Sequence, residues 1–450
     1  MQLSQFKHLY FLGIGGIGMS ALARYFVRLG KEVAGYDRTE TPLTQALTDL
    51  GMRIHYTDEV EQIPAHFGAD NTLVVLTPAI PADHREWAHL RHNGYTILKR
   101  AEVLGLITQD TFCFAVAGTH GKTTTSSILG HLLYQAGVDV TAFVGGIVEN
   151  YQSNLIGTGT SVTVVEADEF DRSFLKLHPN VACITSMDAD HLDIYGDADH
   201  IEAGFRAFAA LLPAKADLFF PDGLALDGRR LAIGHTADYH AENVQIENEQ
   251  FAFDLCQNNT VLGRFVFGLP GRHNLMNALT ALAMAHNYGV AIADLQRGLA
   301  SFQGIQRRFS YQIRSAEVVY VDDYAHHPTE IDAVHQALRS LYPDRRICAI
   351  FQPHLFSRTR DFMADFARSL GQFDHCWVLP IYPARELPIA GITSEALIAM
   401  MPEGKGQWVA KKDWVETAVH DPATVFVTIG AGDISDEVNA FKQLLIKQRL

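Results

Sequence analysis

Cysteine and long apolar runs are both scarce in this sequence. The five cysteines are scattered without C-x-x-C spacing and mostly lie in apolar runs, which indicates buried thiols in a reducing compartment. No apolar stretch of about 18 residues or more is present, so no transmembrane helix is expected. The N-terminal segment also lacks the basic and apolar regions of a signal peptide. We therefore expect a cytoplasmic protein that does not enter a membrane.

Positive charge is also in short supply. The chain carries 36 basic and 51 acidic residues, a net charge of −15, and has no concentrated basic stripe. Nonspecific binding to nucleic acid is therefore not expected, because it depends on neutralising phosphates with lysine and arginine. With 48% hydrophobic and 19% charged residues, the composition is that of a globular protein with a substantial core. The 450 residues have room for three domains at about 150 residues each.

Apolar runs that predict strands alternate with helical patterns along most of the chain. In the N-terminal part we expect helices and strands in turn, with strands at 8–15, 32–37 and 71–80. Such alternation predicts parallel sheets with helical crossovers. We divide the chain into three α/β units, at 1–107, 108–312 and 313–450.

The second and third units differ in their patterns. The part at about 215–270 is more irregular and β-rich, and a helical run follows it. In the third unit, four apolar runs alternate with helical stretches and again predict a parallel sheet. These runs lie at 317–324, 346–353, 375–382 and 424–432.

The segment AVAGTHGKTTT at 115–125 is the most informative motif in the chain. An apolar run ends at Gly118, and a helix-forming run follows Lys122 and Thr123. A strand that enters a helix through such a turn presents backbone N–H groups to anions, which the helix dipole also favours. We predict that Lys122 reaches the outer phosphates of a nucleoside triphosphate and that the Thr123 hydroxyl binds Mg²⁺. Val116 replaces the first glycine of the general pattern, and a purely structural turn is the alternative.

A second glycine turn, GIGGIG at 13–18, lies between the first predicted strand and the first predicted helix. Asp37 closes the next strand about 20 residues later, where a ribose-binding carboxylate would be found. Taken literally, the motif is a nicotinamide dinucleotide site, but the same turn can hold any pyrophosphate. Glycines needed only for tight helix–strand packing are the alternative. The chain is thus expected to have two phosphate-binding turns.

Acidic residues follow two strands predicted near the phosphate loop. Glu166, in the run EADE, is placed to bind Mg²⁺ directly or through water, with a solvated acidic loop as the alternative. His191 lies among Asp188, Asp190 and Asp193 after another strand. The cysteine partners of a structural zinc site are missing there. We therefore expect a second Mg²⁺ position, with a lone surface histidine as the alternative.

Polar clusters also mark the later part of the chain. Asn274 and Asn277 are three residues apart near a predicted helix start, which places them on one helix face, although N-capping alone would explain Asn274. In the third unit, the runs at 322–328 and 352–360 each follow a strand and are rich in histidine and arginine. Facing one crevice, they would suit a carboxylate substrate. A helix N-terminal role is the alternative for the His-His pair.

Together these motifs resemble the bacterial Mur ligases over nearly the whole chain. AGTHGKTTT at 117–125 is shared across that superfamily, whereas DDYAHHPTE at 322–330 with FQPHLFSRTRDF at 351–362 is more specific to the alanine-adding members. The remaining matching runs are GIGGIGMSALA (13–23), EADEFDRSFL (166–175), DADHLD (188–193), GRHNLMNALTA (271–281) and SFQGIQRRF (301–309).

The resemblance implies three domains: an N-terminal Rossmann-like domain for a UDP-sugar, a central P-loop ATPase domain and a C-terminal Rossmann-like domain for the amino acid. It implies an ATP-dependent ligase that joins L-alanine to the lactyl carboxylate of UDP-N-acetylmuramate through an acyl phosphate, in peptidoglycan precursor synthesis. Mg²⁺ is the expected cofactor, and the chain is expected to be a monomer or a homodimer. In this family the first glycine loop holds UDP pyrophosphate and not NAD.

The resemblance also assigns roles to individual residues. The expected catalytic residues are Lys122, Glu166, His191 and Arg358, and the expected metal ligands are Thr123, Glu166 and His191. Contacts to ATP are expected from Gly118, Thr119, His120, Gly121, Lys122, Thr123, Thr124, Asn274, Asn277, Arg308, Asp323 (at the ribose) and Tyr324 (on the adenine). Contacts to the UDP-sugar and to alanine are expected from Gly15, Gly16, Ile17, Gly18, Asp37, His326, His354 and Arg358.

Three features depart from the family pattern. Leu355 occupies a position where some members carry an arginine near alanine, which predicts fewer charged contacts to that substrate. Thr77 and Pro78 replace a serine pair common after the third predicted strand, which leaves the contacts to the UDP-sugar open. Residues 201–210 contain no lysine, whereas sister ligases use a carbamylated lysine in that vicinity.

Three other functions would account for part of these features. A ligase that recycles murein by attaching a tripeptide to the same UDP-sugar would need a wider amine pocket, and the run at 352–360 argues against it. A nucleotide-dependent binding module without chemistry is a second alternative. A NAD-dependent oxidoreductase would explain the first glycine loop but leave AGTHGKTTT without a purpose.

Overall fold

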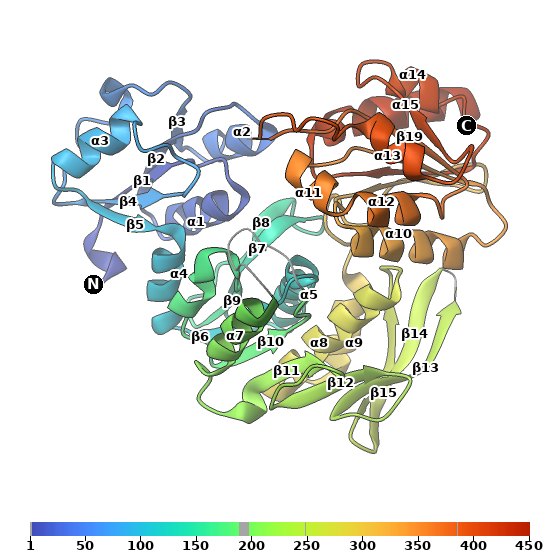
Figure 1. Cartoon of the computed structure of the whole chain (residues 1–450). Coiled ribbons are helices and arrows are strands. Elements are labelled where there is room, and N and C mark those ends of the chain that lie inside the picture. Colours follow the sequence, from blue (N-terminus) through green and yellow to red (C-terminus); the bar gives the residue numbers. More distant parts are fainter. Residues whose placement is uncertain (1, 189–197, 248, 385) are drawn as a thin grey trace. The chain divides into compact units, whose positions relative to one another are not determined.

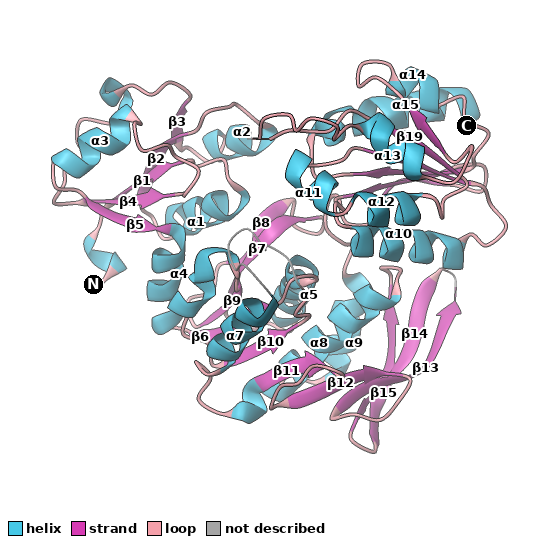
Figure 2. Ribbon diagram, in the orientation of Figure 1, coloured by secondary structure: helices cyan, strands magenta, loops and turns pink. Residues whose placement is uncertain are grey.

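The computed structural model describes residues 2–188, 198–247, 249–384 and 386–450. These residues fall into two compact units. The first unit covers 1–246, 251–267 and 276–303, and the second covers 247–250, 268–275 and 304–450. Figure 1 shows the elements in chain order, and Figure 2 shows that helices and strands alternate along most of the chain.

The first unit contains a five-stranded sheet with the order β3-β2-β1-β4-β5, in which every pair of neighbours is parallel. The chain changes its direction of winding at β1, and ligands of open α/β sheets bind outside the carboxyl ends of the strands at such a point. The strands are β1 His8–Leu12, β2 Glu32–Tyr36, β3 Arg53–His55, β4 Thr72–Leu76 and β5 Thr96–Lys99. The helices are α1 Ile17–Arg28, α2 Pro42–Thr48, α3 Arg85–His92 and α4 Arg100–Gln109.

The residues of β1 show why this segment is a near-continuous apolar run. Leu9 and Phe11 are buried in one hydrophobic cluster, and Tyr10 and Leu12 are buried in another. Successive side chains of a strand point to opposite faces, so a sheet covered on both faces needs apolar residues at every position.

The sequence prediction missed β3 and β5, and Thr77–Pro78 therefore follows the fourth strand and not the third.

The first unit also contains a ten-stranded sheet with the order β15-β14-β13-β12-β11-β10-β6-β9-β7-β8. Strand β6 is parallel to both of its neighbours, β9 and β10, whereas β7–β8 and β14–β15 are antiparallel pairs. Strands β11 to β15 confirm the prediction of a β-rich part at about 215–270, and the hairpin β7–β8 was missed.

The elements around this second sheet have the following bounds. The strands are β6 Phe112–Ala117, β7 Val140–Val148, β8 Ser153–Gly157, β9 Val162–Glu166, β10 Val181–Ile184, β11 Leu218–Pro221, β12 Arg229–Ile233, β13 Tyr239–Glu247, β14 Gln250–Gln257 and β15 Thr260–Phe267. The α-helices are α5 Lys122–Gln135, α7 Ala198–Ala209, α8 Arg272–Tyr288 and α9 Ile292–Ser301.

The second unit contains a six-stranded sheet with the order β16-β17-β21-β18-β19-β20. The four pairs from β17 to β20 are parallel, as predicted, but the edge strand β16 is antiparallel to β17. The strands are β16 Ser310–Arg314, β17 Val319–Asp323, β18 Ile347–Phe351, β19 His375–Val378, β20 Gly406–Trp408 and β21 Val425–Ile429. The α-helices are α10 Pro328–Leu341, α11 Phe356–Asp361, α12 Met363–Leu370, α13 Ser394–Met400, α14 Trp414–Ala418 and α15 Val438–Arg449.

Hydrophobic clusters cover both faces of this sheet. One cluster includes residues of α10 and α12, and the other includes residues of α14 and α15. Figure 1 shows these two pairs of helices on either side of the strands. The predicted domain boundaries near 107 and 313 fall inside α4 and β16 and stay predictions. No helix among the described residues is long and apolar enough to cross a membrane.

Candidate active site

The phosphate loop has the strand–turn–helix order that the sequence predicts. Strand β6 ends at Ala117, and α5 begins at Lys122 after Gly121, whose φ of +85° is left-handed. A Cβ atom on Gly121 would also lie 2.6 Å from Asn277 Oδ1, so both backbone and space require glycine here. The turn thus presents the first N–H groups of α5 at its N-terminus, where anions are favoured.

Lys122 is held inside this loop by backbone and side-chain oxygens. Its ammonium donates to the carbonyl of Gly118 at 2.6 Å and pairs with Glu169 Oε1 at 2.8 Å. The Glu169 side chain is only 5% exposed. Burial raises the pKa of Glu169, and the positive charge of Lys122 acts in the opposite direction. A phosphate at this turn would therefore compete with Glu169 for the ammonium.

Two of the three predicted metal ligands are brought together beside the loop. Thr123 Oγ1 donates to Glu166 Oε2 at 3.2 Å, and Ser126 Oγ donates to Glu166 Oε1 at 3.1 Å. The backbone N–H of Gly145 also donates to Glu166 Oε1. A hydroxyl and a carboxylate form the oxygen donor set that Mg²⁺ prefers. These residues fit a magnesium ion at the phosphate end of the site.

The predicted second metal position is only partly described. His191 lies outside the described residues, as do Asp190 and Asp193. Asp188 is exposed, and its carboxylate lies 3.6 Å from His120 Nε2 of the phosphate loop. The neighbouring Thr119 hydroxyl donates to the Asp188 carbonyl at 2.9 Å.

The first glycine loop and the phosphate loop line one cavity of about 350 Å³. Gly16, Ile17 and Gly18 contribute from the start of α1, and Lys122 and Glu166 contribute from the start of α5 and the end of β9. The two turns predicted to bind phosphates therefore meet at one site within the first unit.

Asp37 is engaged by the glycine turn itself. The backbone N–H of Gly15 donates to Asp37 Oδ2 at 2.7 Å, and a Cβ on Gly15 would lie 2.9 Å from that oxygen. Gly18 approaches Arg100 in a similar way, because a Cβ there would lie 2.8 Å from Arg100 Nη1. Arg100 also pairs with Asp168 at 3.3 Å, and both residues line the cavity.

The second unit brings the predicted histidines together at the carboxyl ends of β17 and β18. The rings of His326 and His354 have their centroids 6.3 Å apart. His326 Nδ1 donates a hydrogen bond to the Tyr324 carbonyl at 3.0 Å, and burial lowers the pKa of His326. Arg358 Nη1 lies 3.4 Å from His354 Nδ1, and the His354 ring stacks on Tyr382 at 5.6 Å.

The two residues predicted to contact ribose and adenine already have partners in this unit. The Asp323 carboxylate accepts from the N–H groups of Phe309 at 2.7 Å and Ala325 at 2.8 Å. Burial nevertheless raises the pKa of Asp323 to about 7. The Arg307 guanidinium carbon lies 4.9 Å from the centroid of the Tyr324 ring, so one face of this ring is covered. Ribose and adenine contacts stay predictions.

Leu355 has an unusual backbone conformation next to His354. Its φ is +73° and its ψ is 136°, a combination that side-chain-bearing residues rarely adopt. The Leu355 N–H donates to the Tyr382 carbonyl at 2.9 Å, and α11 begins at the following residue. Such strained positions cluster at functional sites, where surrounding structure maintains them.

The two asparagines of α8 are both buried. The helix begins at Arg272, so Asn274 lies within its first turn and is not the N-cap, which makes the capping alternative wrong. Asn274 Nδ2 donates to the Pro270 carbonyl at 2.7 Å.

Arg308 is the remaining predicted contact to ATP. Its positive charge lowers the pKa of Asp323, against the effect of burial, which raises it.

Three family models match successive parts of the chain. The Mur ligase family catalytic domain matches 8–111, the Mur ligase middle domain matches 116–285, and the Mur ligase glutamate ligase domain matches 307–432. This chain belongs to the Mur ligase family. Membership and the three sheets confirm the predicted three-domain α/β architecture.

Several known proteins are similar to this Mur ligase over nearly its whole length. A protein of Flavobacterium johnsoniae named UDP-N-acetylmuramate–L-alanine ligase is 58% identical over 99% of both chains. The protein of the same name from Flavobacterium psychrophilum is 56% identical, again over 99% of both. The solved structure of the UDP-N-acetylmuramate–alanine ligase of Thermotoga maritima has a TM-score of 0.83 at 26% identity, covering 98% of this chain and 99% of that one.

Sequence analysis of this Mur ligase missed three residues of the site. Glu169 lies in the recognised EADE run, but nothing in its spacing indicates a pair with Lys122, 47 positions away. Ser126 lies in the predicted helix after the phosphate loop, and no motif there distinguishes it from the other residues of that helix. Arg100 stands at the junction of β5 and α4 without any motif around it.

Proposed function

We propose that this Mur ligase joins L-alanine to the lactyl carboxylate of UDP-N-acetylmuramate, with ATP as co-substrate. The observation that carries the proposal is the cavity lined by Gly16, Gly18, Lys122 and Glu166. A turn suited to a pyrophosphate lies there beside groups suited to a triphosphate. Phosphorylation of a carboxylate on a sugar nucleotide requires this proximity, because the two substrates must meet in a reactive geometry.

The choice of sugar and amine is supported by the names of the full-length relatives, at 58% and 56% identity. A murein peptide ligase from Psychrobacter arcticus shares the fold with a TM-score of 0.68 at 23% identity. That likeness shows the fold alone and does not favour a tripeptide as the amine.

The proposed reaction has two steps. A carboxylate oxygen of the lactyl group attacks the γ-phosphorus of ATP, ADP leaves, and an acyl phosphate forms. The neutral amine of alanine then attacks the acyl carbon, inorganic phosphate leaves, and the amine loses a proton as the amide forms. In the first step Lys122 would exchange its contacts to Glu169 and to the Gly118 carbonyl for phosphate oxygens. Its charge would then stabilise the transferring phosphoryl group.

Thr123 and Glu166 would hold Mg²⁺ at the phosphates, since both offer oxygen atoms to one point. When bound, the ion supplies charge neutralisation for the phosphoryl group. We keep His191 as a ligand of a second ion on the resemblance alone.

At the amine end, we assign His326, His354 and Arg358 to the binding of alanine. The two rings and the guanidinium gather beyond the carboxyl ends of β17 and β18, which lie on either side of β21. A guanidinium and a histidine N–H are suitable donors to the carboxylate of an amino acid. Leu355 stands where some members carry an arginine, so we expect fewer charged contacts to that carboxylate.

The proposal also includes domain boundaries near 107 and 313, a monomer or homodimer, and a cytoplasmic location. The last of these rests on the substrates, because ATP and nucleotide sugars are made and used in the cytoplasm.

Release of ADP tests this function directly. UDP-N-acetylmuramate and ATP are supplied with L-alanine in one reaction and with the tripeptide in another, and turnover is expected with alanine. Turnover only with the tripeptide would support the recycling ligase instead. ADP release that does not respond to sugar and alanine together would favour a binding module without chemistry.

The acyl phosphate is tested separately. With ¹⁸O in the lactyl carboxylate, one labelled oxygen should appear in the released inorganic phosphate. Unlabelled phosphate alongside amide product would exclude the proposed first step.

A further inference from the structure

The C-terminal domain has a second cavity, of about 750 Å³, that the reaction above does not use. Arg346 directly precedes β18, His375 opens β19, and Asp421 lies just before β21, and all three line this cavity. They therefore lie at the amino ends of parallel strands. His326 and His354 follow the carboxyl ends of strands in the same sheet. The cavity is thus at the edge of the sheet opposite the amine end of the site.

Trp377 forms part of the wall of this cavity and offers an unused hydrogen-bond donor. The residue is only 8% exposed and belongs to the hydrophobic cluster on this face of the sheet. Its indole Nε1 is buried and has no hydrogen-bond partner within the part of the chain that the structure describes. A buried N–H group without an acceptor is costly, so an acceptor supplied from the cavity would be favourable.

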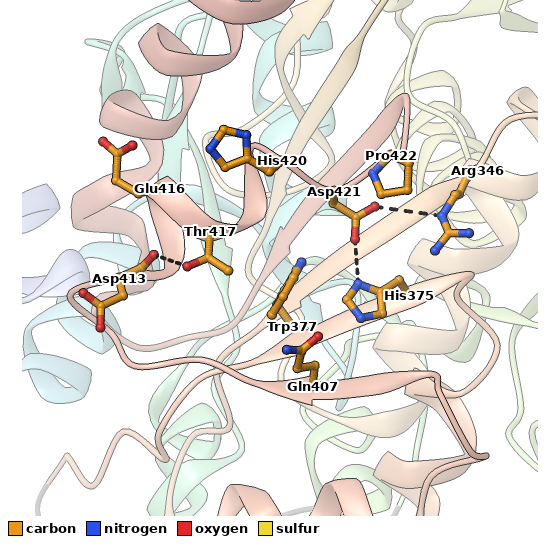
Figure 3. A pocket seen from close by; sticks show the side chains of 10 residues that line it. All are labelled: Arg346, His375, Trp377, Gln407, Asp413, Glu416, Thr417, His420, Asp421 and Pro422. Carbon is orange, nitrogen blue, oxygen red and sulfur yellow. Dashed lines mark hydrogen bonds and ion pairs between the residues drawn. The ribbon is translucent and has the colours of Figure 1, made fainter.

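The charged residues around Trp377 are separated by sign. Figure 3 shows Asp413 and Glu416 on one side of the indole and Arg346 on the other. On the basic side, His375 Nδ1 donates to Asp421 Oδ2 at 2.6 Å, and Arg346 Nε lies 3.9 Å from Asp421 Oδ1. The Asp421 charge is therefore compensated, while the Arg346 side chain is 48% exposed and has further N–H groups to donate.

Among the residues that line the cavity, the acidic side has no lysine or arginine, and its other titratable residue is the exposed His420. Asp413 and Glu416 are exposed, and across 2–188, 198–247, 249–384 and 386–450 no ion pair to either carboxylate is found. A ligand that complements this cavity carries a positive group at one end and a hydrogen-bond acceptor with negative charge at the other. A simple anion would meet the two carboxylates, and a simple cation would meet Arg346.

We propose that this cavity binds a short peptide with a free amino terminus and a free carboxylate. The carboxylate would accept from Arg346 and from the Trp377 N–H, and the ammonium group would lie near Asp413 and Glu416. The volume is within the range of about 300–1,000 Å³ that is typical of small-ligand sites and exceeds the need of a single amino acid. The Gln407 side chain also lines the cavity and can pair with a peptide group. Such a ligand would bind apart from ATP and alanine.

Titration calorimetry on the intact protein tests this site with three matched probes: L-alanyl-L-alanine, its N-acetyl derivative and its C-terminal amide. The free dipeptide is expected to bind, and each blocked form should bind at least about tenfold more weakly, because one charged contact is lost. Equal binding of all three, or no heat beyond dilution because the cavity holds only water, would overturn the proposal.

Variants locate the bound dipeptide. Arg346→Gln and Trp377→Phe should each weaken binding about fivefold or more, since the first removes the positive charge and the second removes the indole N–H, while the size of each side chain is nearly kept. Lys412→Gln, which changes a neighbouring exposed charge outside the cavity, should not alter binding. Binding that is lost in His354→Ala but kept in Arg346→Gln would place the dipeptide at the amine end of the reaction site and refute the proposal.

Discussion

Replacing Lys122 by methionine would show whether the phosphate-loop lysine also stabilises the folded chain. From the sequence alone, loss of this side chain should abolish turnover and leave the fold intact, because it removes little packing. In the structure, however, the ammonium lies 2.8 Å from the nearly buried carboxylate of Glu169. Burial raises the pKa of Glu169 and Lys122 opposes that rise, so the pKa should increase further when the ammonium is removed.

The size of the effect follows from the cost of protonating this carboxyl group. A carboxyl group whose pKa is higher in the folded state than in the unfolded state binds its proton more tightly when the chain is folded. Its contribution to the free energy of unfolding therefore falls as the pH rises above the pKa in the unfolded state, about 4.3 for glutamate. Without Lys122, the folded variant can either keep Glu169 ionised or take up a proton on it, and it adopts the state of lower free energy. The loss of stability therefore cannot exceed the cost of protonation, which is about 1.4 kcal/mol for each pH unit above 4.3. The variant should therefore lose at most about 1 kcal/mol at pH 5 and about 4 kcal/mol at pH 7.

Thermal unfolding without nucleotide, followed from pH 5 to pH 7, measures this difference. A change of 1 kcal/mol in the free energy of unfolding shifts the thermal midpoint of a domain of this size by about 2–4 °C. The difference in thermal midpoint between wild type and Lys122→Met should therefore widen by several degrees from pH 5 to pH 7. The double variant Lys122→Met/Glu169→Gln is the control, and the difference between its thermal midpoint and that of the wild type should not widen as the pH rises, because Glu169 is no longer there to be ionised. If the single variant shows the same difference at both pH values, Glu169 does not depend on the charge of Lys122 and the reasoning fails.

Four further predictions concern the reaction itself. Thr123→Val removes the hydroxyl that lies 3.2 Å from Glu166 Oε2 and should lower ADP release about 100-fold with little change in thermal midpoint; a normal rate would remove Thr123 from the metal site. His354→Ala should raise the KM for alanine about fivefold and leave that for ATP unchanged, and an unaltered alanine KM would separate His354 from the amine. Gly18→Ala should raise the KM for UDP-N-acetylmuramate, because its Cβ would lie 2.8 Å from Arg100 Nη1; equal KM values would show that the loop adapts. Chelation with EDTA should stop ADP release and added Mg²⁺ should restore it, whereas activity that resists EDTA would speak against a metal.

The parts of the site that the sequence predicted are encoded locally. The phosphate loop joins an apolar strand, two glycines and a helix within 20 or so residues, and each of these signals is visible in the chain itself. The glycine turn at 13–18 is visible for the same reason. The family resemblance then supplied the order of the three domains, which the three matching family models confirm.

The parts that were missed depend on contacts between distant segments. Glu169 meets Lys122 across 47 positions, and Arg100 meets Asp168 across 68 positions, so no local spacing reveals either pair. The edge strand β16 was not among the predicted strands, and its antiparallel direction is decided only by its pairing with β17. Short strands such as β3, with three residues, give too few positions for a period to be recognised.

The backbone conformation of Leu355 has a cost in stability and lies next to His354, which we propose to contact alanine. A residue with a side chain at φ +73° costs of the order of 1–3 kcal/mol, which the rest of the domain must offset. Glycine would adopt this conformation freely and would make the domain harder to unfold. The same freedom would let the neighbouring imidazole of His354 swing away from Tyr382, against which it stacks. A more heat-resistant enzyme obtained in this way would be expected to discriminate less well between alanine and other small amino acids.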